Sequence, residues 1–190
     1  MKMIQKLTLS FALGLSSLFG ADFIVDPTHS SIDFKVRHMM VSNTKGSFSD
    51  FLGTFSYDNK SRRLLALDGV VKIASVDTKD TKRDKHLRSA EFFDAQNFPT
   101  MHMQFIKQNK DRVAVDLTIK DVTKRVIFEM EDASDIVKDP WGGRRAGFAL
   151  RGKINRQDFN MKFSELMETG AVMVGNEVKL SLEIEGTQER

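Results

Sequence analysis

The side chains best suited to catalysis or metal binding are the four histidines, His29, His38, His86 and His102. Histidine binds metals and transfers protons near neutral pH because its ordinary pKa lies there. Their separations of 9, 48 and 16 residues match none of the short spacings that place metal-binding histidines together. The chain also has no cysteine. We therefore expect no metal site and no cofactor, since either would need distant residues to meet in the fold.

Nucleophilic catalysis has little support in the sequence. Ser30 and Ser31 follow His29 directly, but neighbouring strand residues point to opposite faces, which separates a nucleophile from its base. No Gly-x-Ser-x-Gly motif occurs. Asp158, two residues after Arg156, is expected to form a structural ion pair at a tight turn. We expect no catalytic residues.

Residues 77–99 form the clearest helical interruption of the chain. Apolar residues recur there with helical spacing, and Pro99 ends the helical tendency. Phe92 and Phe93 follow the helical part and can anchor it over an apolar core. We predict a short helical lid over about residues 80–94.

The charges of the predicted lid exclude one class of partner. Residues 77–94 contain five bases and five acids, whereas binding to a nucleic-acid backbone requires an excess of bases. We expect no nucleic-acid partner. Two alternatives stay open for Arg83, His86 and Arg88: they belong to a solvated helix with ion pairs, or they turn inward at the rim of a cavity.

Residues 1–20 have the organisation of a cleavable secretory signal peptide. Lys2 and Lys6 precede an apolar run over residues 7–15, and small residues follow it. A run of nine residues is too short to cross a bilayer, which takes about 20. We predict a mature domain over residues 21–190 that is periplasmic or secreted and has no membrane span.

Most of the remaining chain alternates between apolar and polar residues, which is typical of strands with one buried face. Eight segments have this pattern: 32–38, 46–55, 65–74, 101–105, 113–119, 126–130, 146–154 and 178–184. Segment 46–55 needs a bulge near Ser49 to keep its phenylalanines on one face. Because closure removes exposed sheet edges, we predict an all-β fold, an eight-stranded antiparallel barrel.

A barrel of eight strands holds either packed side chains or one small ligand. Its predicted inner face is rich in Phe and Met and includes Gly53, Gly69 and Gly152, which leave volume. We predict a ligand-binding cavity lined by Phe34, Val36, Phe48, Leu67, Val71, Met103, Phe105, Leu117, Phe128, Phe148, Leu150, Leu180 and Leu182. His38, Arg83 and Arg88 are the candidates for binding a ligand's head group. Any apolar residue of this set could equally be packed core.

Six short patches occur in an order and spacing that resemble the YceI-like family of polyisoprenoid-binding, bacterial lipocalin-like proteins. The resemblance extends over about residues 22–188. The patches are Asp26-Pro27-Thr28-His29-Ser30-Ser31-Ile32-Asp33-Phe34-Lys35-Val36-Arg37-His38, Gly46-Ser47-Phe48, Ser75-Val76-Asp77-Thr78, Arg83-Asp84-Lys85-His86-Leu87-Arg88-Ser89 with Phe92-Phe93-Asp94, Phe98-Pro99-Thr100, and Asn155-Arg156-Gln157-Asp158-Phe159.

This resemblance implies an extended eight-stranded antiparallel barrel of lipocalin-like shape, exported to the periplasm or beyond. It implies a non-enzymatic role in which a long amphiphile, such as an isoprenoid, a quinone or a fatty-acid amide, occupies an apolar channel, with possible homodimers and a part in stress responses. The family commonly has glycine where this chain has Asn160 and Asp121. Asparagine tolerates a positive φ, whereas aspartate does so less readily.

Two other functions remain as alternatives. The first is a solid-cored barrel that acts as an interaction module for a protein partner or a dimer. The second is a lipid-modifying enzyme that uses histidines and acids at the rim. A continuous apolar void inside the barrel would favour the carrier over the solid-cored module.

Overall fold

The structure is a computed structural model that describes residues 20–167, 170 and 172–188. The predicted signal peptide lies outside the described residues except for Gly20. The elements are β1 (Ala21–Val25), β2 (Ser31–His38), β3 (Ser42–Phe48), β4 (Phe51–Asp58), β5 (Arg63–Lys72), the 3₁₀ helix η1 (Ile73–Ser75), β6 (Val76–Asp77), α1 (Thr81–Leu87), β7 (Thr100–Asn109), β8 (Arg112–Ile119), β9 (Val122–Glu131), β10 (Val137–Lys138), β11 (Arg144–Asn155), the 3₁₀ helix η2 (Arg156–Phe159) and β12 (Val174–Gln188).

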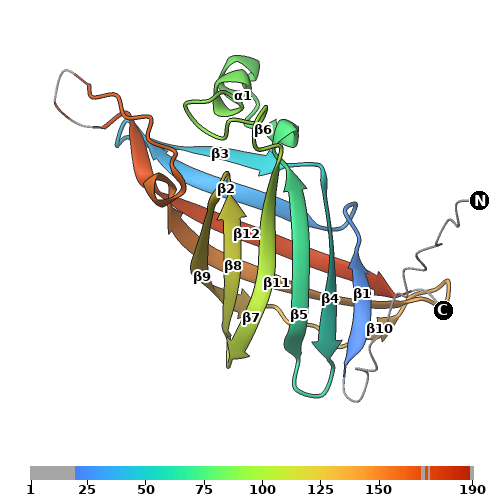
Figure 1. The fold of residues 1–190 in the computed structure, drawn as a ribbon. Coiled ribbons are helices and arrows are strands. Elements are labelled where there is room, and N and C mark those ends of the chain that lie inside the picture. The colour runs from blue at the N-terminus through green and yellow to red at the C-terminus, as the bar shows by residue number, and fades with distance from the viewer. Residues whose placement is uncertain (1–19, 168–169, 171, 189–190) are drawn as a thin grey trace, which may run out of the picture.

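Eight of the strands form a closed antiparallel barrel (Figure 1). Neighbouring strands follow the order β11-β9-β8-β7-β5-β4-β1-β12, and β12 pairs again with β11 to close the ring. Closure leaves no free edge around this ring, which is the usual way for an antiparallel sheet to avoid edge-to-edge association. The predicted fold class is confirmed.

The sheet also extends beyond the ring. One edge of β12 pairs with β1 near its C-terminal end and with β2 over residues 174–183. Beyond β2 the sheet continues to β3 and then β6. This extension lies next to α1 in Figure 1. The barrel is therefore elongated on the side that carries the helix.

Two predicted strand assignments differ from the structure. Segment 46–55 is not one bulged strand, because the chain turns at Ser49 and Asp50 and its two parts pair with different neighbours. The ring also contains β1, which no alternating segment predicted. A strand of five residues is too short to show a clear alternation of apolar and polar side chains. Its pairing with β4 and β12 defines it as a strand.

The helix α1 is shorter than the predicted lid. The carboxylate of Asp80 begins it by accepting hydrogen bonds from the amides of Lys82 and Arg83, at 3.0 and 3.1 Å. Buried Asp84 accepts bonds from the amide and the hydroxyl of Thr78. The helix ends at Leu87, and turns complete the lid. Across the described residues, no helix has the length and apolar composition required to cross a bilayer.

The two positions that depart from the family pattern lie together in the structure. Asn160 has φ 59° and ends η2 in the left-handed region, a conformation that asparagine tolerates. Its side-chain amide donates to the carboxylate of Asp121 at 3.3 Å. The positive φ of the β8–β9 turn falls on Lys120 and not on Asp121. Both turns are therefore formed without glycine.

Aromatic side chains fill the half of the barrel that lies away from the lid. The rings of Phe23 and Phe148 each lie 5.1 Å from that of Phe55, and the Tyr57 ring meets Phe55 edge to face. The Tyr57 hydroxyl donates to the carbonyl of Ser134 at 2.8 Å. These aromatic residues are at most 3% exposed, so this end of the barrel is a solid core.

Two glycines on the inner face show where the barrel is filled and where it is open. A Cβ atom at Gly152 would lie 2.7 Å from the Phe128 ring, whereas at Gly69 the nearest atom is a carbonyl oxygen of Leu52 at 3.9 Å.

We expect Gly152→Ala to lower the free energy of unfolding by about 1–3 kcal/mol through overpacking. Gly69→Ala should be neutral or stabilising by up to about 1 kcal/mol. Urea denaturation of the matched pair tests this, and equal losses would contradict it.

Candidate functional site

An apolar cavity of about 440 Å³ occupies the half of the barrel beneath the lid. Its walls come from β2, β5, β7, β8 and β12, and its roof includes Leu87 of α1 together with Phe92 and Phe93. Volumes of this size are typical of sites for small organic ligands. The barrel interior is therefore divided into an open half and a filled half.

Eleven of the sixteen predicted binding residues line this cavity. They are Phe34, Val36, His38, Phe48, Leu67, Val71, Arg83, Met103, Leu117, Leu180 and Leu182. Strand alternation identified the apolar members of this set, because every second residue of a strand points inward, whereas Arg83 of α1 and His38 are the head-group candidates. Their contact with a ligand stays a prediction.

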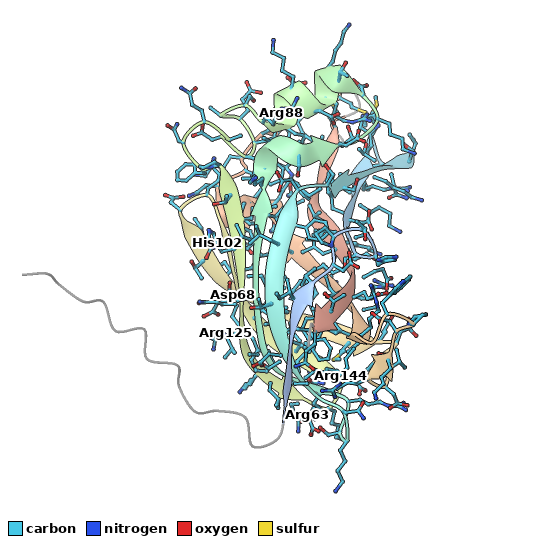
Figure 2. All side chains as sticks on the ribbon, turned by 90° about the vertical axis from the view of Figure 1, so that its right-hand side faces the viewer. Arg63, Asp68, Arg88, His102, Arg125 and Arg144 are labelled. Carbon is cyan, nitrogen blue, oxygen red and sulfur yellow. The ribbon has the colours of Figure 1, made fainter. Side chains whose placement is uncertain are left out.

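The other five predicted residues lie outside the cavity lining. Phe128, Phe148 and Leu150 are at most 3% exposed and belong to the filled half. Phe105 lies two residues along β7 from Met103 and packs against the same core. Arg88 reaches backbone carbonyls of Ala74 and Val76 at 3.4 Å each, and Figure 2 shows it at the lid end of the molecule.

Three aromatic side chains close the cavity next to the lid: His86, which the sequence left open as an inward-turned residue at the rim, and Phe92 and Phe163, which were not in the predicted site. The His86 ring lies 5.0 Å from that of Phe92 and 5.1 Å from that of Phe163, and the two phenylalanines lie 5.0 Å apart. All three line the cavity. One feature of the sequence indicated Phe92, which was expected to anchor the lid over the apolar core. No feature of the sequence indicated Phe163, which lies in no alternating segment.

The polar side chains at the rim mostly have partners within the protein. His86 Nε2 forms a short contact with Glu91. Arg83 donates to the Thr78 hydroxyl at 2.7 Å and to its carbonyl at 2.8 Å. Arg83 therefore has a fixed position at the rim, where its remaining donors can meet a ligand's head group.

Arg156 is a buried cation in the wall of the cavity. Its guanidinium donates to the carbonyls of Gly175, Met161 and Val174 and to the Asn176 side chain, at 2.7–3.3 Å. Burial lowers its pKa. The predicted pair with Asp158 is wrong, because Asp158 is exposed and the guanidinium binds carbonyl oxygens instead. Arg156 thus holds the start of β12 against the chain after η2.

A separate polar cluster joins the β1–β2 turn to β11 and β12. The ligand atoms of Asp26, His29 and Glu185 lie within 4.8 Å of one another, a separation that could suit a metal ion. Arg145 already donates to both carboxylates, at 3.1 Å for Asp26 and 2.5 Å for Glu185. The guanidinium occupies the place of a cation, so this cluster has the character of an ion-pair network.

This network predicts an effect of pH on stability. Hydrogen bonds from Thr28 and His29, with a further one from Arg145, hold the pKa of Asp26 well below its usual range. A lowered folded-state pKa stabilises the fold above the unfolded pKa of about 4, and this contribution is lost as pH falls below it. We expect Asp26→Asn to destabilise the protein clearly at neutral pH and much less near pH 2.

Urea denaturation at the two pH values measures that difference. Asp135→Asn is the control, since Asp135 forms an exposed pair with Arg62, a kind of pair that contributes little to stability. A destabilisation by Asp26→Asn that did not depend on pH would contradict the expectation.

The structure is a closed eight-stranded antiparallel barrel with an apolar cavity beneath a lid. This architecture places the protein in the class of lipocalin-like barrels. The model of the YceI-like domain family matches residues 23–186. Protein YceI of Escherichia coli O6:H1 is 36% identical over 189 residues, covering 96% of this chain and 94% of the relative. The chain belongs to the YceI-like family.

Two solved structures resemble this one. The YCEI protein of Campylobacter jejuni has a TM-score of 0.70 and 31% identity, covering 80% of this chain and 90% of that chain. A polyisoprenoid binding domain from Saccharophagus degradans has a TM-score of 0.63 and 12% identity, covering 88% and 98%. The second likeness concerns the fold alone.

Proposed function

We propose that this protein is a non-enzymatic, exported binding protein that carries or sequesters a long-chain amphiphile. The observation that carries this proposal is the apolar cavity of about 440 Å³ inside the closed barrel. An isoprenoid, a quinone or a fatty-acid amide has the chemistry that such a lining accepts. The Saccharophagus degradans domain, described as polyisoprenoid binding, has the same fold and supports this ligand class.

The energetics of such binding follow from the chemistry of the lining. Burial of each methylene contributes about 0.8 kcal/mol, so a chain of about 20 carbons supplies roughly 16 kcal/mol before the costs of ordering it. One or two polar contacts at the rim suffice to orient the head group. Arg83 and His38 line the cavity and are our candidates for these contacts.

The alternatives fit the structure less well. A barrel that acted only as a solid-cored interaction module would have no need of the cavity. A lipid-modifying enzyme would use rim histidines, yet His86 contacts Glu91 and two aromatic rings. Homodimer formation and export to the periplasm or beyond remain proposals, which light scattering and cell fractionation test.

Extraction of the purified protein with organic solvent, followed by mass spectrometry, is the direct test of carriage. We expect a long-chain amphiphile in the extract, and uptake of offered polyprenols, quinones or fatty-acid amides by the stripped protein. A clean extract together with no uptake of any of these classes would overturn the proposal.

A further inference from the structure

Four lysines lie in one row across four neighbouring strands outside the cavity. Lys45 of β3 is directly opposite Lys35 of β2, Lys35 is opposite Lys179 of β12, and Lys179 is opposite Lys153 of β11. Directly opposite residues of an antiparallel pair have their side chains on the same face, and like charges there destabilise the sheet. The row therefore favours the approach of an anionic surface.

The lysine row lies on the outer face of the sheet. Phe34 and Leu180, each next to a lysine of the row in sequence, line the cavity, and neighbouring strand residues point to opposite faces. Glu177 forms an ion pair with Lys153 at 2.9 Å, and Asp33 and Asp77 line the same surface hollow as Lys35, Lys45 and Lys179. Among the described residues, Lys35 and Lys45 have no hydrogen bond or ion pair through their side chains.

The β2–β3 hairpin that carries half of this row ends in an exposed apolar tip. Met39, Met40 and Val41 are 38%, 53% and 78% exposed. Met39 and Met40 have φ of 49° and 59°, a left-handed conformation that is uncommon for residues with long side chains. The Val41 amide donates to the His38 carbonyl at 3.1 Å, so the turn has the usual form of a two-residue hairpin. The exposure of three consecutive apolar residues at its tip indicates a contact surface.

This tip lies beside the part of the cavity wall that includes His38, Glu165 and Met173. The Met39 amide donates to the Met173 carbonyl at 2.7 Å, and the Met173 amide donates to the Glu165 carbonyl at 2.9 Å. His38, Glu165 and Met173 all line the cavity. Leu166, the next residue along, is 67% exposed. The exposed apolar side chains of the hairpin tip and of Leu166 thus lie next to residues that line the cavity.

We propose that the β2–β3 hairpin docks this protein on an anionic phospholipid bilayer. Met40 and Val41 enter the interfacial region of the bilayer, while the long side chains of the lysine row, four or five residues and so about 13–17 Å away along the strands, meet the lipid phosphates. Apolar insertion combined with basic side chains is the chemistry by which proteins bind reversibly to anionic membranes. Docking in this way turns this side of the cavity wall toward the source of an amphiphile, but the docking itself does not require a carried ligand.

Sedimentation with vesicles tests the docking directly. We expect the protein to bind vesicles that contain about 30% phosphatidylglycerol in phosphatidylcholine, to bind pure phosphatidylcholine far more weakly, and to dissociate as NaCl rises from about 0.05 to about 0.5 M. The triple variant Lys35→Gln, Lys45→Gln, Lys179→Gln should lose at least about tenfold in vesicle affinity. Met40→Ser with Val41→Ser should also weaken binding, because it removes the inserted groups.

A matched control removes the same charge elsewhere. Lys107, Lys124 and Lys138 are exposed residues of β7, β9 and β10, away from the hairpin. Their change to glutamine should leave vesicle affinity within about twofold of the original. Thermal unfolding of the hairpin triple variant should be unchanged or shifted upward, since like-charge repulsion is relieved.

Three outcomes would overturn the proposal: equal binding to neutral and anionic vesicles, equal losses in the two triple variants, or salt-sensitive binding to single-stranded DNA without binding to vesicles. A clean lipid extract would remove the carrier function and leave vesicle docking untouched. The two proposals can therefore fail separately.

Discussion

Arg156→Ala is expected to lower the free energy of unfolding by about 3–5 kcal/mol, a large fraction of the stability of a single domain. The guanidinium is 3% exposed and donates to three backbone carbonyls and to Asn176. Each buried acceptor left without a partner costs about 1–3 kcal/mol. Urea denaturation followed by circular dichroism measures the loss.

The control for this substitution is an arginine with similar bonds at the surface. Arg125 forms a two-bond pair with Asp116, at 3.0 and 3.1 Å, and lies on the outside of the barrel in Figure 2. Exposed pairs contribute at most about 1 kcal/mol, so Arg125→Ala should cost no more than that. Similar losses in the two variants would show that the buried hydrogen bonds of Arg156 do not stabilise the fold.

Met103→Trp is expected to reduce the affinity for a long-chain amphiphile at least about tenfold, because it places a larger side chain in the cavity that the ligand would occupy. Met103 of β7 lines the cavity between Gly69 and Leu117 on the neighbouring strands. A loss of tenfold corresponds to about 1.4 kcal/mol, less than two buried methylenes.

Phe105→Trp is the matched control for Met103→Trp. Phe105 lies two residues along the same strand, is similarly half-buried, and does not line the cavity. Titration of both variants with a fluorescent fatty-acid analogue should show a loss only for Met103→Trp. Equal affinities would mean that the ligand binds elsewhere. Substitutions at Phe128 or Leu150 are poor probes, because both residues are fully buried in the filled half.

Much of the fold could be predicted because period-two alternation marks the inward face of a strand without reference to its neighbours. The inward residues of β2, β5 and β12, such as Phe34, Leu67 and Leu180, were identified in this way. The same reasoning missed Phe163 and Arg156 as parts of the cavity wall, because they lie in a loop and a 3₁₀ turn. Neither kind of segment has a regular period.

The alternating pattern does not predict how far along the barrel axis a side chain lies, or which side chains of other strands it packs against. Gly152 and Gly69 have the same pattern in the sequence, but the Phe128 ring fills the space beside Gly152 while Gly69 faces open space. Phe128 and Gly152 are 24 residues apart in the chain and meet only because β9 and β11 are neighbours in the sheet. The register between such strands decides which glycine is covered.

The amino-acid sequence by itself determined the strand-rich class, the inward faces and the family of this protein, because these depend on local periodicity and on short motifs. Only the tertiary structure decided that one half of the barrel is solid and that the half beneath the lid is open. The reason is that a cavity is the difference between the volume enclosed by the strands and the volume of the side chains within it. That difference depends on how residues distant in the chain pack together.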